Sequence, residues 1–179
     1  MNENQATKVV TGKVRFSYLH VWEPAAVEEG SQKKYSVSLI IPKSDTDTVA
    51  RIKNAIQSAL EAGKAKFGGK IPASLKLPLR DGDIERADDD AYLNSWFLNA
   101  NSSKQPGIVD QNVQPILRQD EIYSGCYGRA SINFFAFNTN GNKGIACGLN
   151  NIQKLSDGEL LGGRTTAEFD FADDCSDIL

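Results

Sequence analysis

The sequence predicts a mainly β protein, a small barrel with one inserted α-helix over about residues 44–67. Short segments with period-2 alternation of apolar and polar residues recur between glycine- and proline-rich loops, which is typical of strands. Helical spacing of apolar residues occurs once, whereas a doubly wound sheet would need a helix at every crossover. The 179 residues suit a single domain, which we expect over residues 1–165, followed by a disordered acidic tail at 166–179.

The first predicted strand is long and runs from Lys8 to Trp22. Successive side chains of a strand point to opposite faces, so its even positions share one face. That face carries the rings of Phe16, Tyr18, His20 and Trp22. The sequence therefore predicts one strand with an aromatic face.

The second predicted strand spans residues 34–41, and the single helix follows it. Ser44 is the expected N-cap, with Asp47 three residues on as an acidic form of the capping box. Apolar residues then follow helical spacing until Gly68, which ends the helix. Gly63 falls on the apolar stripe, where the missing side chain allows close packing.

The remaining strands are predicted at residues 92–99, 113–117, 125–137 and 144–155. The turn at 138–144 contains asparagines and glycines that tolerate positive φ. We therefore expect the last two strands to form a hairpin.

Composition excludes several classes of protein. No segment approaches the run of ~18 apolar residues that a membrane span needs, and the polar N-terminus lacks a signal-peptide core. Three cysteines at unequal gaps match neither a disulfide framework nor a zinc ribbon, and they fit a reducing compartment. A single histidine, His20, leaves few routes to acid–base catalysis near neutral pH. We expect no enzymatic activity, no cofactor and no metal.

The net charge of -3 hides an asymmetry. Residues 167–179 contain five acidic residues and no basic one, leaving 18 acids against 20 bases in the rest of the chain. The body is therefore mildly basic, and acidic charge is segregated in the tail.

The acidic loop Asp81–Asp90 supports an alternative function. A two-metal nuclease site could be built from its carboxylates, although a solvated loop is the simpler interpretation. It fails as a calcium loop, because Arg86 stands where glycine is needed and Tyr92 where glutamate is needed. A second alternative is a protein-interaction module without DNA binding, in which the aromatic residues form the core and the tail binds a protein.

Flat rings beside cations are the most informative pattern. The odd positions of the segment 125–137 carry Tyr127, Phe135 and Phe137, with Arg129 among them. On an exposed sheet such rings stack on unpaired bases without reading sequence, for roughly 1–3 kcal/mol per base. Aromatic residues at period 2 also fill barrel interiors, so the pattern alone leaves both roles open.

Blocks of sequence along nearly the whole chain resemble the phage single-stranded-DNA-binding proteins of OB-fold type. These blocks are Phe16-Ser-Tyr18 with Glu23-Pro24, Tyr35–Lys43, Leu79–Asp83, Pro106–Asp110, Gly125–Ser131, Gly141–Ile145 and Gly148–Asn150. The resemblance implies a five-stranded OB barrel with an added helix. It also implies binding of single-stranded DNA in phage DNA replication, recombination or repair, in the cytoplasm of an infected bacterial host.

In the expected mechanism, basic side chains neutralise phosphates and rings stack on bases, so little sequence preference is expected. The residues that we expect to stack on bases are Tyr18, Trp22, Trp96 and Tyr127. The residues that we expect to bind phosphates are Arg15, Lys33, Lys34, Arg80, Lys104 and Arg129.

The acidic tail resembles the termini with which replicative single-strand binders dock partner proteins. The tail residues assigned to docking are Phe169, Asp170, Phe171, Asp173, Asp174, Asp177, Ile178 and Leu179. The usual pattern ends in phenylalanine, so the partner among phage or host replication and recombination proteins stays open. As a tethered anion, the tail should also mimic DNA and compete for the basic groove. A homodimer and a cooperative filament on DNA both stay open.

Overall fold

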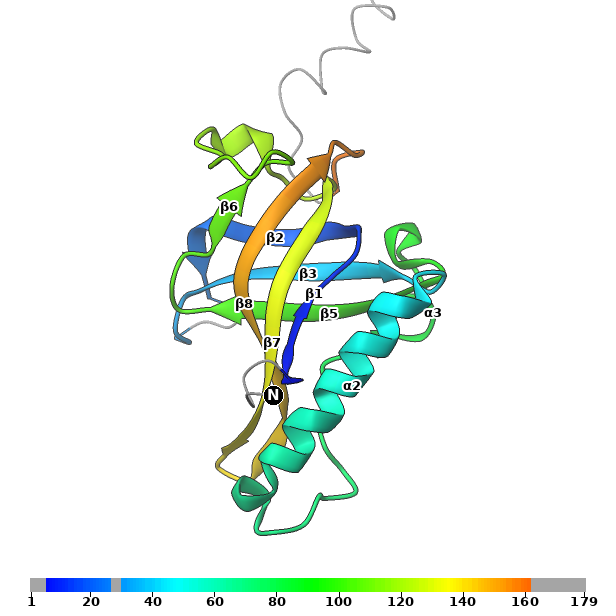
Figure 1. Ribbon diagram of the computed structural model, residues 1–179, viewed down its shortest axis with the longest axis vertical. Coiled ribbons are helices and arrows are strands. Elements are labelled where there is room, and N and C mark those ends of the chain that lie inside the picture. The colour runs from blue at the N-terminus through cyan, green and yellow to red at the C-terminus, as the bar shows by residue number, and fades with distance from the viewer. Residues whose placement is uncertain (1–5, 27–29, 162–179) are drawn as a thin grey trace, which may run out of the picture.

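The computed structural model describes residues 6–26 and 30–161, which form a closed barrel with one long helix beside it (Figure 1). Five strands form the ring. In order around the barrel they are β2 (Val14–Ala25), β3 (Lys34–Pro42), β5 (Ser95–Ser102), β8 (Asn142–Ser156) and β7 (Tyr127–Thr139). β7 pairs with both β8 and β2, so the ring closes. The prediction of a mainly β, five-stranded OB-type barrel is confirmed.

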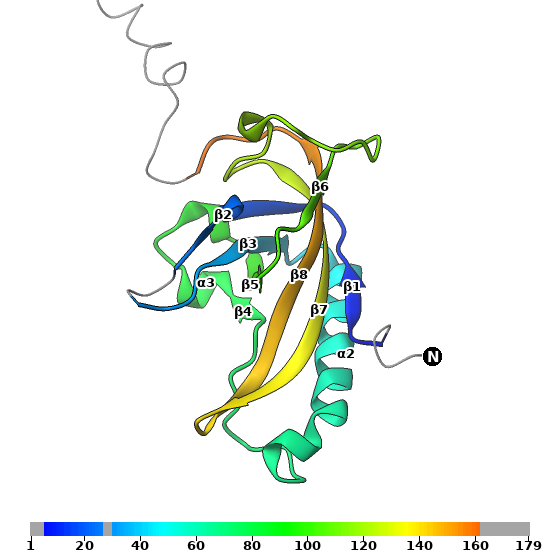
Figure 2. The ribbon, with the colours of Figure 1, turned by 90° about the vertical axis from the view of Figure 1, so that its left-hand side faces the viewer.

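The pairings within the ring are antiparallel except for one. β5 and β8 pair in parallel, with Asn101 opposite Gly148. Three short strands extend the sheet: β1 (Lys8–Val10) on β7, β4 (Arg80–Asp81) on β5 and β6 (Gly107–Val109) on β8. β7 and β8 form a long hairpin that continues past the barrel (Figure 2).

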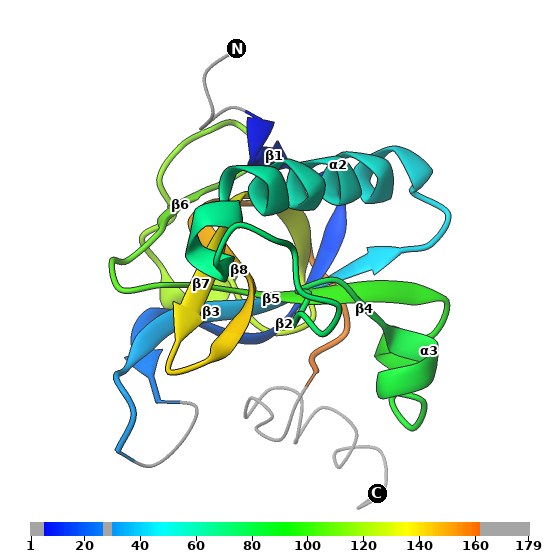
Figure 3. The same ribbon diagram turned by 90° about the horizontal axis from the view of Figure 1, so that it is seen from below.

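The helix α2 (Thr46–Ala62) covers one side of the barrel, where it contacts β7 and β1 (Figure 3). Its buried stripe, including Ile52, joins the main hydrophobic core. Gly63 follows it, and a side chain there would collide with Ala136 of β7, which confirms the predicted close packing. The predicted N-cap was wrong by one residue, because the carboxylate of Asp45 accepts the Thr48 amide at 3.1 Å.

Short helices occupy the connections: α3 (Gly82–Glu85) and the 3₁₀ turns η1 (Lys64–Phe67), η2 (Asp90–Tyr92) and η3 (Gln119–Glu121). The predicted strand at 113–117 was wrong, because Val113 has a positive φ of 62° that interrupts extended backbone. Over the residues that the structure describes, no helix is long and apolar enough to cross a membrane.

The predicted strand from Lys8 to Trp22 is two strands. The extended backbone is interrupted around Gly12, whose amide donates a hydrogen bond to Thr48 Oγ1 at 3.0 Å. A side chain at Gly12 would meet the Asp45 carboxylate, so the break depends on close packing against the start of α2. This tertiary contact overrides the continuous alternation of the sequence.

The predicted aromatic face of β2 is also divided. Phe16 is fully buried in the core, whereas Tyr18 is 59% exposed. Ser17 lies opposite Ser38 and His20 opposite Ser36, so β2 has one extra residue between these pairs. This β-bulge shifts the alternation by one residue and turns Tyr18 and His20 outward.

Candidate nucleic-acid interface

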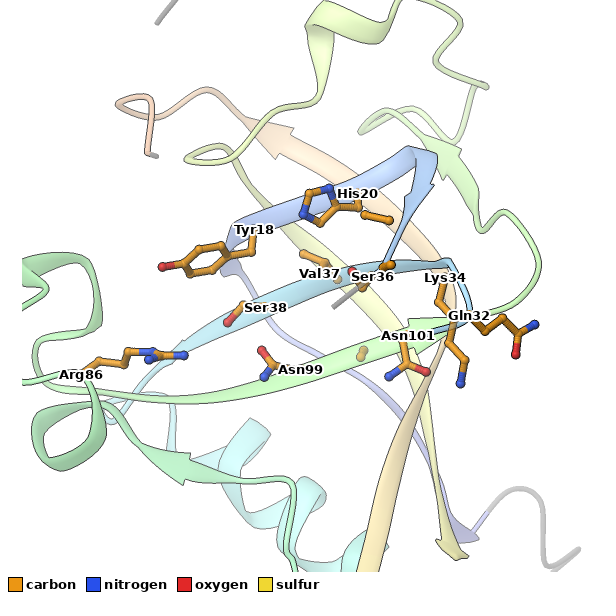
Figure 4. Close-up of a pocket in the computed structure, with 13 residues that line it drawn as sticks. Tyr18, His20, Gln32, Lys34, Ser36, Val37, Ser38, Arg86, Asn99 and Asn101 are labelled. Carbon is orange, nitrogen blue, oxygen red and sulfur yellow. The ribbon is translucent and has the colours of Figure 1, made fainter. Parts of the chain in front are cut away.

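A hollow of about 320 Å³ lies on the outer faces of β2, β3 and β5. Its lining includes Tyr18, His20, Lys34, Arg86, Asn99 and Asn101 (Figure 4). Tyr18 and Arg86 lie at one end in this view, and Lys34 and Asn101 lie at the other. The equivalent face of five-stranded OB barrels is the one on which oligonucleotides bind.

Tyr18 is the exposed ring of this hollow. Its φ of 46° is in the left-handed region, which costs a residue with a side chain about 1 kcal/mol or more. The surrounding backbone enforces it, since the Leu19 amide donates to Ser124 Oγ at 3.0 Å and the Gly125 amide to the Phe16 carbonyl at 2.7 Å. Backbone strain of this kind concentrates at ligand sites.

Arg86 is a cation of the hollow that sequence reasoning missed. Its guanidinium lies 5.3 Å from the centre of the Phe97 ring and 6.0 Å from that of Tyr92. These rings pack edge to face at 5.1 Å, and Tyr92 Oη shares a hydrogen bond with Ser38 Oγ at 3.1 Å. The α3–η2 segment is thereby fixed on the outer face of β3 and β5, with Arg86 at the edge of the hollow.

Several polar side chains of the hollow are free within the described part of the chain, although Ser38 is bonded to Tyr92. Among the described residues, the side chains of Ser36, His20, Asn99 and Asn101 have no hydrogen-bond partner. Asn99 and Asn101 are two residues apart on β5, so both point outward from the barrel. Sequence reasoning did not select them, although this alternation was a usable signal.

The predicted phosphate ligands fall into two groups. Lys34 lines the hollow, Lys33 is exposed immediately before Lys34 in the chain, and Lys104 is exposed in the loop after β5. None of these three ammonium groups forms an ion pair within residues 6–26 and 30–161. They are therefore available for an anionic ligand.

The three predicted arginines already have partners. Arg15 donates to the carbonyls of Gly125 and Glu159, at 3.1 and 2.7 Å. Arg80 forms an ion pair with Glu85 at 3.0 Å. Arg129 donates to the Thr11 carbonyl at 2.9 Å. The structure therefore does not bring these three side chains to the hollow as free cations, although Arg15 lies near its Tyr18 end.

Trp96 lies in a separate cluster beside α2. The ammonium groups of Lys43 and Lys53 lie 5.2 and 5.1 Å from its ring centre, and the half-buried ring packs against the core. Lys43 also forms ion pairs at 2.8 Å with both Asp81 and Asp83. We call these five residues the Trp96 cluster.

The ion pairs of the Trp96 cluster shift the pKa values of Lys43 and Asp83. Hydrogen bonds to Asp81 and then Asp83 raise the pKa of Lys43 above its ordinary 10.5. The hydrogen bond from Lys43, followed by that from the Asn94 amide, lowers the pKa of Asp83 below its ordinary 3.8. Both effects stabilise the charged forms.

The other two predicted stacking rings are half-buried. Trp22 packs against the core, and its buried indole Nε1 has no hydrogen-bond partner in the part of the chain that the structure describes. Tyr127 lies under Lys13 and Arg15, with cation-to-centre distances of 5.1 and 5.3 Å. Of the four predicted rings, the structure places only Tyr18 in the hollow.

The acidic loop is built from local contacts. Asp81 accepts the Asp83 amide and Asp89 accepts the Ala91 amide, at 3.0 and 3.1 Å. The described residues contain no group of three or more potential metal ligands. The tail assigned to partner docking, 166–179, lies outside the described residues.

Known proteins resemble this chain over most of its length. Residues 7–178 match the family described as Enterobacter phage Enc34, ssDNA-binding protein. Protein p50 of Acyrthosiphon pisum secondary endosymbiont phage 1 is 32% identical over 176 residues, covering 94% of each chain.

Solved structures of phage proteins share the fold. The single-stranded DNA-binding protein from bacteriophage Enc34, in complex with ssDNA, is 26% identical with a TM-score of 0.75, over 90% of this chain and 96% of that one. The single-stranded DNA-binding protein gp2.5 of bacteriophage T7 is 14% identical with a TM-score of 0.60, over 93% of each chain. The T7 likeness concerns the fold alone.

Proposed function

The chain belongs to the family of the Enterobacter phage Enc34 ssDNA-binding protein, and from this we propose that it binds single-stranded DNA in phage DNA replication, recombination or repair. The observation that carries the proposal is the hollow on β2, β3 and β5, where the exposed ring of Tyr18 lies among free cations and free polar groups. Both phage DNA-binding proteins named above share the barrel that presents this face.

We propose that different side chains in and next to the hollow contact the bases and the phosphates. Tyr18 stacks on one base, and Arg86, Lys33 and Lys34 neutralise phosphates on either side. Stacking and phosphate contacts carry almost no base code, so the binding is independent of sequence. Duplex DNA is excluded because its bases are already stacked on one another and cannot reach the Tyr18 ring.

The remaining predicted contacts take a secondary place in this proposal. Trp22, Trp96 and Tyr127 can stack on a base only after a neighbouring cation or packed group moves away. Arg15, Arg80 and Arg129 can bind phosphate only in exchange for, or beside, their present partners. The ammonium group of Lys104 has no ion pair among the described residues and lies beyond the end of β5, where a longer oligonucleotide would reach it.

A fluorescence titration tests the proposed function. Fluorescently labelled thymidine oligonucleotides of graded length should bind and gain fluorescence anisotropy, whereas a matched labelled duplex should bind far more weakly. The length at which affinity levels off gives the site size, which is about 4–16 nucleotides for one OB fold. Equal affinity for duplex and single strand, or no binding of either, would contradict the proposal.

We also propose that residues 166–179 act as a tethered competitor and as a docking segment for a partner protein. Truncation after Thr166 should tighten DNA binding, most strongly at low salt where charges are least screened. An unchanged affinity of the truncated protein at every salt concentration would refute the competition.

A further inference from the structure

The hollow continues into neighbouring hollows at both of its ends. At one end, Tyr18 and Arg86 also line a second hollow beside the segment Glu85–Ala91. At the other end, Lys34 and Asn101 also line a further hollow that includes Phe135 of β7. A polynucleotide longer than the hollow must leave through one of these openings.

The opening at Tyr18 is acidic on balance, because its carboxylates outnumber the guanidinium groups of Arg15 and Arg86. Its lining includes Asp88, Asp89 and Asp90, which are exposed and form no ion pair with any described residue. The three carboxylates are carried by the α3–η2 segment, which Tyr92 anchors on the outer face of the barrel. They therefore face any phosphate that passes this opening, and like charges repel.

The opening at Lys34 has the opposite character. Lys34 is exposed and unpaired over the described ranges, and Phe135 is 44% exposed on the outward face of β7. Both side chains line the same hollow, together with polar groups such as Asn133. A cation for a phosphate and a ring for a base thus lie beyond the end of the first hollow.

A third opening leads sideways from Asn99 towards Phe137. Its arginine, Arg80, is held in an ion pair by Glu85. Phe137 is only partly exposed and packs close to Gly144. Exposed Lys76 gives this opening a cation without an ion pair among the described residues, but no exposed ring lies beside it, so the opening lacks the combination found at Lys34.

From these openings we infer the path of the bound single-stranded DNA, and this inference rests on the proposed function. Single-stranded DNA leaves the Tyr18 hollow past Lys34 and stacks a further base on Phe135, and Asp88–Asp90 close the opposite opening. The acidic segment thus fixes where the binding site ends.

The first arm of the test uses Phe135→Ala, with Phe137→Ala as the matched control. Oligothymidines are titrated from the shortest that binds to one beyond the site size. Phe135→Ala should weaken binding of the long oligonucleotide about fivefold to a hundredfold and leave the shortest unaffected, because only the long one reaches the second ring. Phe137→Ala should leave both unchanged. Equal losses in the two variants, or no loss in Phe135→Ala, would overturn the path.

The second arm removes charge at the opposite opening. Asp88→Asn with Asp90→Asn should tighten binding about twofold to tenfold at low salt, and the gain should fade as screening increases. The control, Asp47→Asn with Glu61→Gln on α2, changes net charge equally away from the hollow. A similar gain in affinity in both double variants would show that only net charge matters, and would contradict the claim that Asp88–Asp90 close this opening to DNA.

Tyr18→Ala separates this inference from the proposed function. If Tyr18→Ala weakens DNA binding and Phe135→Ala does not, the path is wrong and the function stands. If neither change alters binding, the proposed site itself is wrong.

Discussion

The Tyr18 hollow and the Trp96 cluster combine the same chemical groups to opposite effect. The exposed Tyr18 ring lines the hollow together with Lys34 and Arg86, which have no carboxylate partner among the described residues. In the cluster, two lysines cover the half-buried Trp96 ring, and Lys43 is held by two carboxylates. An aromatic residue with a cation nearby is therefore not enough to identify a binding surface. What distinguishes the hollow is that its ring is exposed and that its cations have no carboxylate partner among the described residues.

This comparison predicts the largest effect for Trp96→Ala, and that effect is on stability. Removing a half-buried ring that packs against the core should lower the free energy of unfolding by about 3 kcal/mol, the low end for truncation of a large aromatic residue. Urea denaturation measures the loss. The dissociation constant for single-stranded DNA should change less than it does in Tyr18→Ala. A larger loss of affinity than of stability would show that Trp96 is the main stacking ring.

Tyr18→Ala should have the converse effect. Loss of one stacked base should weaken single-stranded DNA binding by about 2 kcal/mol while the slope of affinity against salt stays the same. Tyr18→Phe, which keeps the ring, should retain most of the affinity.

Tyr18→Gly adds a control for folding. Glycine adopts a φ of 46° without steric strain, so thermal stability should be retained while DNA binding is lost. A glycine variant that binds DNA as tightly as the wild type would exclude Tyr18 as a stacking residue.

The sequence predicted the fold well where structure depends on local alternation. The odd positions of β7, such as Arg129 and Phe135, point outward, and the even ones, such as Ile132, point inward. The long helix and the β7–β8 hairpin were also confirmed, but the α-helix ends at Ala62 and only a 3₁₀ turn continues to Gly68, and a second, short α-helix, α3, was not predicted. The resemblance to a known family added the closed five-stranded ring.

The candidate site was harder to predict because distant contacts shape it. The bulge that exposes Tyr18 depends on Ser124, which is more than 100 residues away in sequence. Arg86 reaches the hollow only because Tyr92 packs against Phe97. Conversely, Arg80 and Trp96 were selected for their chemistry, and the sequence does not show that Glu85 and two lysines already contact them.

A smaller effect is expected from lysine substitutions in the two regions. Lys34→Gln should make the log–log salt dependence of binding less steep by about 0.7, the change for one phosphate contact on a single strand. Lys53→Gln removes the same charge from the Trp96 cluster and should leave the slope unchanged. Equal slopes in the two variants would mean that Lys34 does not contact phosphate.

The smallest effect concerns acid stability, to which Asp83 of the Trp96 cluster contributes. Lys43 lowers the pKa of Asp83 in the folded protein below its ordinary 3.8. The ion pair therefore stabilises the fold fully above about pH 3.8, and this stabilisation is lost as the pH falls through the lowered pKa of the folded state. The melting temperature should therefore fall as the pH drops below 3.8. In Lys43→Met the melting temperature should fall less steeply with decreasing pH in this range. An unchanged pH dependence would show that the ion pair does not contribute to stability.

Photochemical cross-linking can locate the DNA on the protein. A thymidine oligonucleotide in which 5-bromouracil replaces thymine is irradiated in complex with the full chain, and the attached residue is identified by mass spectrometry. We predict attachment at Tyr18 that is lost when unlabelled single strand competes. Attachment at Trp96, with none at Tyr18, would contradict the assignment of the hollow as the DNA-binding surface.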